Sequence, residues 1–170
     1  YPTLKDYHLA VENAMWEISH GDESLRYAKA IPVFSQLPKN PLRPGPAYNL
    51  VALIPEVLKI GQACLGRSDP LPYPGEVVWT TRLVKGWYGK AYWDLTKPHG
   101  EGVIRINRLL DSPSVDLETL RFLLWHEYLH LYLKAGHTKE FRRLECCWPG
   151  YSDANLFLEN LNEVFGIQYW

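Results

Sequence analysis

The chain has few sulfur-containing residues and no long apolar run. It has only one methionine and three cysteines, an odd number, and no two cysteines form a CxxC pair. This excludes a disulfide framework and a cysteine zinc knuckle, and it favours a reducing, cytoplasmic compartment. Cys146 and Cys147 are adjacent, and we expect them to be buried small side chains, with a free-thiol role as the alternative. No run approaches the length of a membrane span, and no stretch is typical of a signal peptide.

The chain also lacks a strong charge of either sign. Its 18 basic and 19 acidic residues leave a formal net charge of −1. We therefore expect no broad basic surface for nucleic-acid phosphates, and Arg142 and Arg143 are only a short pair on a helix surface. Apolar residues, by contrast, make up 46% of the chain, and aromatic residues make up 14%. A chain of this length and composition can bury a globular core without disulfides.

The spacing of apolar residues predicts an α+β domain. The expected helices cover residues 3–30, 47–65, 117–135, a segment from about 138, and 153–165. The expected strands cover 77–84, 87–95 and 99–107, and they form a small antiparallel three-stranded sheet packed on the helix 117–135. We expect a helical N-terminal region, 1–75, with a proline-rich connector, 31–46, packed on a core of residues 76–170.

The clearest chemical pattern is HEYLH, residues 126–130. Residues four apart lie on one face of a helix, so His126 and His130 can bind one ion. Glu127 lies about 100° round the helix, where it can take a proton from water and deliver it to a leaving amine. Two imidazoles with one position left for water suit zinc. The helix is apolar on nearly all sides, so its buried histidines need partners, and a metal ion provides one. The alternative is two core histidines satisfied by local hydrogen bonds.

A third ligand is expected, because catalytic zinc usually has three protein ligands. The helix is expected to begin after Asp116 and to stop at Gly136, so that the turn brings His137 towards the metal. The spacing differs from the metzincin pattern HExxHxxGxxH, in which glycine comes a full turn earlier, so no Met-turn is expected. Carboxylates stay open as alternatives for the third ligand: Glu140, Glu159 and Glu163.

The stretch from 102 to 145 resembles the SprT-like and related WLM-type minimal zinc metallopeptidases. The resemblance is carried by the phrase Ile104-Arg105-Ile106-Asn107 with Leu109 and Leu110, by the HExxH helix, by His137 with Phe141, and by the glycine-containing LVKGWYGKAYW upstream. It implies a compact zincin-like domain, zinc bound by His126, His130 and His137, and Glu127 as general base and acid. It also implies a peptide or protein substrate that docks antiparallel on the edge strand beside the active helix. The cysteine-rich zinc ribbon and basic tail of some members are missing, which weakens a DNA-linked role.

The function that we expect is therefore a zinc-dependent endopeptidase. The competing hypothesis is a catalytically silent or latent zinc-binding interaction domain of the same fold. In a latent enzyme, the proline-rich stretch 31–46 or the C-terminal FGIQYW would lie in the cleft and block it.

Overall fold

The structure is a computed structural model that describes residues 47–81, 84, 86–111 and 115–165, without the side chains of 160 and 163–165. Its helices are α3 (Leu50–Cys64), α4 (Leu117–Leu133), α5 (Lys139–Cys146) and α6 (Tyr151–Phe165), and a short 3-10 helix covers Arg108–Leu110. Its strands are β1 (Gly75–Trp79), β2 (Gly89–Trp93) and β3 (Gly102–Ile106). The expected α+β class is confirmed. The expected helix 3–30, the connector 31–46 and residues 166–170 lie outside the described residues.

The sheet is mixed, so the prediction of a wholly antiparallel sheet was wrong. The strand order is β1-β3-β2, with β1 parallel to β3 and β2 antiparallel to β3. The strands β1 and β2, which were expected to run antiparallel to each other, are therefore not neighbours. β3 takes the central place because it carries the most buried apolar side chains of the three strands, Ile104 and Ile106.

The link between β1 and β2 explains why no hairpin forms. The amide nitrogen Nδ2 of Asn107, just after β3, donates to the carbonyl oxygens of Val84 (2.6 Å) and Trp87 (3.0 Å). The carboxamide oxygen of the same buried side chain accepts from the backbone N–H of Leu109. These bonds hold the chain between β1 and β2 against the end of β3, so that β2 begins on the side of β3 opposite to β1.

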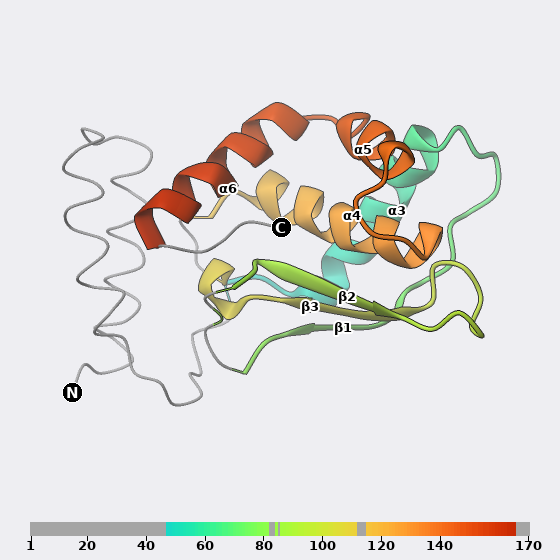
Figure 1. Cartoon of the computed structure of the whole chain (residues 1–170), viewed down its shortest axis with the longest axis horizontal. Helices are drawn as coiled ribbons and strands as arrows, with labels where there is room; N and C mark the ends of the chain where they lie inside the picture. The colour runs from blue at the N-terminus through green and yellow to red at the C-terminus, as the bar shows by residue number, and fades with distance from the viewer. Residues whose placement is uncertain (1–46, 82–83, 85, 112–114, 166–170) are drawn as a thin grey trace.

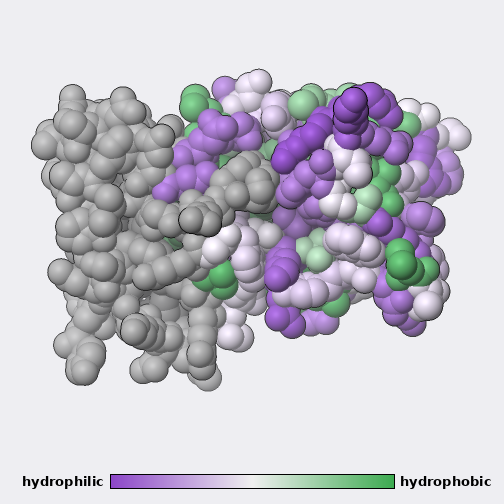
Figure 2. All heavy atoms as spheres, viewed as in Figure 1, coloured by the Kyte–Doolittle hydropathy of each residue, from purple (hydrophilic) through white to green (hydrophobic). Residues whose placement is uncertain are grey.

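Helix α4 is the centre of the molecule. It packs against β2, β3, α3, α5 and α6, and nearly every residue from Thr119 to Leu131 is buried. Figure 1 shows the sheet on one side of α4 and helices α5 and α6 on the other. On the face shown in Figure 2, hydrophobic side chains of the described residues form small patches among hydrophilic ones. The expectation of a helix buried nearly all round is confirmed.

The start of α4 follows the sequence prediction, but its end does not. Asp116 is the N-cap, and its side chain accepts a hydrogen bond from the N–H of Glu118 at 3.2 Å. The C-cap is Lys134, with φ 50° and ψ 46°, rather than Gly136. A left-handed conformation costs a non-glycine residue energy. The Lys134 ammonium offsets that cost, because it donates to the carbonyl oxygens of Leu95 (3.1 Å) and Lys97 in the turn after β2.

In the described part of the chain, no helix has both the length and the apolar character that crossing a membrane requires.

Candidate metal centre

Three histidines converge beside α4. One ligand nitrogen from each of His126, His130 and His137 lies within 4.8 Å of the other two, an arrangement that could hold a metal ion. His126 and His130 are buried on α4, whereas His137 is exposed in the link between α4 and α5. The Nε2 atoms of His126 and His137 are 3.3 Å apart. The HExxH spacing therefore brings its two histidines together as expected, and His137 joins them.

The early turn at Lys134 brings His137 back over the helix. The chain leaves α4 in the left-handed region at Lys134, and the N–H of Thr138 then bonds to the carbonyl of Gly136 at 2.9 Å. Thr138 caps α5 by accepting from the N–H of Phe141 at 3.2 Å. The side chain of His137, between these two contacts, therefore faces the two histidines of α4.

The ring orientations suit metal binding. Nδ1 of His130 lies 2.8 Å from the carbonyl oxygen of Ala135. A carbonyl oxygen can only accept, so this ring carries its hydrogen on Nδ1 and offers the lone pair of Nε2. Nδ1 of His126 lies 2.5 Å from Oε2 of Glu145, which fixes the same tautomer in that ring. Histidines that bind metals characteristically use their second nitrogen in this way.

The donor set fits zinc. Two nitrogens bound to one tetrahedral zinc ion at about 2.0–2.1 Å stand roughly 3.3–3.4 Å apart. The Nε2 atoms of His126 and His137 already have a separation of 3.3 Å. Three imidazoles also form the ligand set of several catalytic zinc centres, in which a fourth position is left for water or substrate.

All three histidines are held in the neutral form that metal binding requires. Burial lowers the pKa of His126 to about 4, because water no longer solvates the charged ring and the hydrogen bond that His126 donates to Glu145 offsets only part of that loss. Burial also lowers the pKa of His130 and of His137, and the neighbouring positive charge of Arg142 adds to the effect. A cation therefore meets little competition from protons at neutral pH.

Glu145 belongs to the candidate site, although the sequence did not predict it. It lies in α5, is fully buried, and accepts from the guanidinium of Arg142 at 2.9 Å as well as from His126. Burial raises the pKa of the Glu145 carboxyl, but the hydrogen bonds with His126 and Arg142 outweigh burial and hold that pKa below its usual range. The ionised carboxylate therefore orients the His126 ring. The available signal was its place on the buried face of α5, one turn after Phe141.

Glu127 lies next to the histidine cluster, as its place in HExxH predicts. Its Oε1 is 3.8 Å from Nε2 of His126, and its side chain is almost wholly buried. Burial, with the negative charge of Glu145 as a second cause, raises the pKa of Glu127 to about 8.

Gly89 at the start of β2 makes room for Glu127. A Cβ at this position would stand 2.9 Å from both Cγ and Oε1 of Glu127, well inside ordinary contact. The carboxylate can therefore lie against the strand only because residue 89 has no side chain. The sequence reasoning used this glycine as a strand marker and missed its place in the site.

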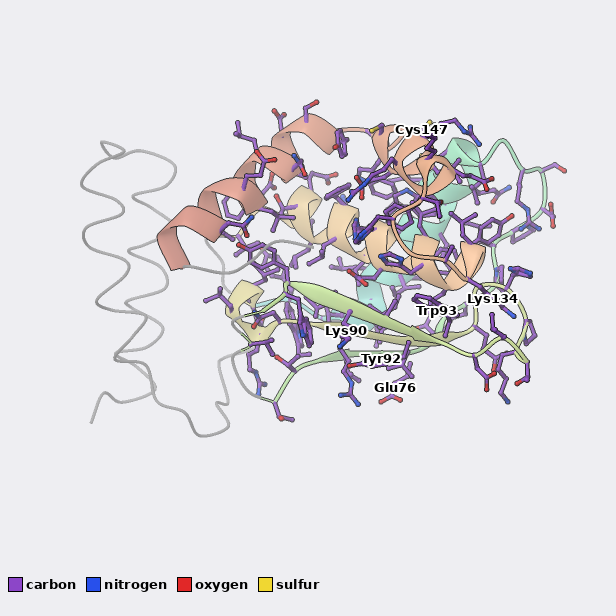
Figure 3. The ribbon with its side chains drawn as sticks, in the orientation of Figure 1. Glu76, Lys90, Tyr92, Trp93, Lys134 and Cys147 are labelled. Atoms are coloured by element: carbon purple, nitrogen blue, oxygen red, sulfur yellow. The ribbon has the colours of Figure 1, made fainter. Side chains whose placement is uncertain are left out.

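Two aromatic rings hold the cluster in place. Phe141 of α5 is fully buried and its ring centroid lies 4.4 Å from that of His130, 4.9 Å from that of His126 and 5.1 Å from that of His137. Trp93, at the end of β2, stacks on His130 with the ring planes 8° apart and the centroids 5.8 Å apart. Trp93 is 37% exposed, so it forms the outer wall of the site next to solvent. Figure 3 shows Trp93 between β2 and the end of α4.

The carboxylates considered as third ligands do not join the cluster in the described part of the chain. Glu140 is exposed in the first turn of α5 and is not part of the group of three ligand atoms. Glu159 is exposed on α6, where its Oε1 accepts from Asn155 at 3.0 Å. The side chain of Glu163 lies outside the described residues.

No protein-family model, curated protein or solved structure that was compared with the chain matches it. The functional assignment therefore depends on the geometry of the histidine cluster and its surroundings.

Proposed function

We propose that this protein is a zinc-dependent endopeptidase with a zincin-like fold of the SprT-like type. The observation that carries the proposal is the position of Glu127. Its carboxylate lies 3.8 Å from Nε2 of His126, on the same buried helix that supplies two of three convergent imidazoles. A purely structural metal site has no use for a buried carboxylate next to its ligands, whereas hydrolysis needs a base at that place.

His126, His130 and His137 would hold the zinc ion, which supplies Lewis acidity towards the scissile carbonyl and a lowered pKa for water. Glu127 removes a proton from the attacking water and later delivers it to the nitrogen of the leaving amine. Burial raises the pKa of the Glu127 carboxyl above its ordinary value. A bound cation would lower that pKa again, and a carboxyl whose pKa lies nearer to neutral pH can both accept and return a proton.

The substrate would dock on β2. This strand lies at the edge of the described sheet, beside α4, and only its β3 side is paired with another strand. Side chains alternate along β2, so Gly89 and Trp93 share the face towards α4, where a Cβ on Gly89 would meet Glu127. Figure 3 shows Lys90 and Tyr92 on the opposite face. An extended peptide that pairs with the open edge of β2 would therefore pass along the histidine cluster, with main-chain hydrogen bonds that hold its scissile bond in place.

The test compares wild type with Glu127→Gln in zinc content and in cleavage of an unfolded protein substrate. We expect stoichiometric zinc in both proteins and a loss of cleavage of at least about 100-fold in the variant, the usual contribution of a general base. Glu140→Gln, an exposed carboxylate next to the site, is the matched control and should keep full activity. Zinc bound by the wild type without cleavage of any tested substrate would indicate the silent interaction domain instead. Full activity of Glu127→Gln would disprove the proposed role of Glu127.

A further inference from the structure

The three cysteines gather at one corner of the molecule, although Cys64 is far from the other two in the sequence. Cys64 is the last residue of α3, Cys146 is the last residue of α5, and Cys147 is the C-cap of α5. Cys146 and Cys147 are exposed and Cys64 is half-buried, so the expectation of buried small side chains was wrong for the adjacent pair. Figure 3 shows Cys147 at the outer end of α5, on the side away from the sheet.

Cys64 and Cys147 are in direct contact. The thiol of Cys64 donates to the backbone carbonyl oxygen of Cys147 at 3.4 Å. Because this carbonyl oxygen is an atom of Cys147, the Cys64 sulfur lies close to the side chain of Cys147. The thiol of Cys147 makes only a weak contact of its own, with the carbonyl of Arg143 at 3.3 Å. A rotation about its Cα–Cβ bond would release the Cys147 sulfur from that contact.

Both sulfurs can be reached from solvent. Cys64 and Cys147 line the same surface pocket of about 530 Å³, between the ends of α3 and α5. The adjacent Cys146 does not line this pocket. The three thiols also do not make a metal site, because within the described residues only the three histidines bring three ligand atoms together. The geometry therefore favours a reaction between two sulfurs over binding of an ion.

We propose that Cys64 and Cys147 form a reversible intramolecular disulfide when the protein meets hydrogen peroxide. This site is independent of the proposed peptidase activity. It joins the end of α5, two residues beyond Glu145, to the end of α3.

The chemistry with hydrogen peroxide has two steps. The exposed Cys147 thiolate attacks the peroxide, its sulfur gains one oxygen to become a sulfenic acid, and hydroxide leaves. The Cys64 sulfur then attacks the Cys147 sulfur, the S–O bond breaks, and water leaves. Two thiols lose two electrons and two protons in total, and one peroxide becomes two waters. Cys147 reacts first because it is exposed, whereas burial, with the nearby Cys147 thiol as a second cause, raises the pKa of Cys64 and keeps it protonated.

Mass spectrometry of the full-length protein tests the proposal. The reduced protein is treated with a small excess of hydrogen peroxide, its remaining thiols are alkylated, and it is digested with trypsin without reduction. Trypsin releases Cys64 in residues 60–67, and it releases Cys146 and Cys147 together in the peptide that begins at Leu144. We expect these two peptides to be joined in the wild type with the loss of two hydrogen atoms, and to be separated again by a thiol reductant.

Single variants identify the partner of Cys64. Cys146→Ser should keep the cross-link and Cys147→Ser should lose it, while Cys64→Ser should accumulate a sulfenic acid on Cys147 that a 1,3-dione reagent traps. The oxidised wild type should also melt at least about 5 °C higher than its reduced form, because the bond closes a long loop in the unfolded chain. A Cys146–Cys147 bond, a disulfide between two molecules, or a cross-link that survives in Cys147→Ser and disappears in Cys146→Ser would overturn the proposal. So would the absence of any disulfide in the oxidised wild type.

Discussion

The carboxylate of Glu145 lies 2.5 Å from Nδ1 of His126, so a residue of α5 sets the orientation of an imidazole on α4. Both side chains are fully buried, and Arg142 binds the same carboxylate from the surface side. The hydrogen bond keeps the hydrogen of the ring on Nδ1 and turns Nε2 towards His137. The supporting residue of the site thus comes from a different helix than the HExxH pattern.

Replacement of Glu145 by alanine should weaken zinc binding by about 10- to 100-fold, the usual effect of removing a partner that orients a metal ligand. His126 would keep its place on α4 but lose the acceptor that fixes its ring. Competition for zinc against a coloured chelator measures the change. Glu140→Gln, on the same helix, should bind zinc like the wild type, and equal affinities of Glu145→Ala and wild type would show that Glu145 has no part in the site.

The third ligand is tested by a pair of substitutions on different elements. His137→Ala should lower zinc affinity by at least about 100-fold, because a catalytic site with two protein ligands holds zinc poorly. Glu159→Gln should leave the affinity unchanged, because Glu159 bonds to Asn155 on the surface of α6. The same titration serves for both variants. The reverse result, zinc lost in Glu159→Gln and kept in His137→Ala, would move the third ligand to α6.

Gly89→Ala should displace the Glu127 carboxylate while leaving the three histidines able to bind zinc. The new methyl group would meet Cγ and Oε1 of Glu127 at 2.9 Å, so the flexible carboxylate must move away from β2. We expect kcat/KM to fall by about 100-fold, as for other small misplacements of catalytic groups, with zinc content unchanged. Gly86→Ala is the matched control, because a Cβ there meets no other atom within 4 Å. Unchanged activity in Gly89→Ala would mean that the position of Glu127 does not limit catalysis.

In the zinc-free protein, the burial of Glu127 should make the free energy of unfolding depend on pH. The folded-state pKa of about 8 lies above the ordinary value of 4.5, so between these pH values the folded state binds more protons than the unfolded state. This contribution is fully present below pH 4.5 and is lost as the pH rises towards 8. Relative to Glu127→Gln, the wild type should therefore lose on the order of 4 kcal/mol in its free energy of unfolding between pH 4.5 and pH 8.

Urea unfolding in the presence of a chelator, at several pH values, measures that difference. The contribution of the buried histidines to the free energy of unfolding changes with pH in the opposite direction. Both proteins contain these histidines, so their contribution cancels in the comparison. If the difference in free energy of unfolding between wild type and Glu127→Gln did not change with pH, Glu127 would be ionised, and hence solvated, in the folded protein.

Local patterns predicted the described helices well. The buried residues around 126–130, the N-cap at Asp116 and the start of a helix near residue 138 each depend on contacts within a few residues, and the structure has all three. The meeting of His126 with His130 follows from helix geometry alone.

The sequence did not predict features that depend on contacts between residues far apart in the chain. The order of the strands depends on Asn107, which holds the link before β2 from beyond β3. The end of α4 depends on Lys134, whose ammonium reaches the turn after β2, whereas Gly136 offered only a local preference. The spacing of Glu145 from Phe141 placed it on the buried face of α5. The sequence could not show which side chain its carboxylate contacts, because that depends on how α5 packs on α4.

An anomalous difference map at the zinc absorption edge, from crystals grown with zinc, tests the central claim most directly. We predict one peak about 2.0–2.1 Å from Nε2 of each of His126, His130 and His137, with the carboxylate of Glu127 next to it but not bound to it. A crystal that contains zinc elsewhere but shows no peak among these histidines would contradict the account. So would a peak that is bound by a carboxylate of α6 in place of His137.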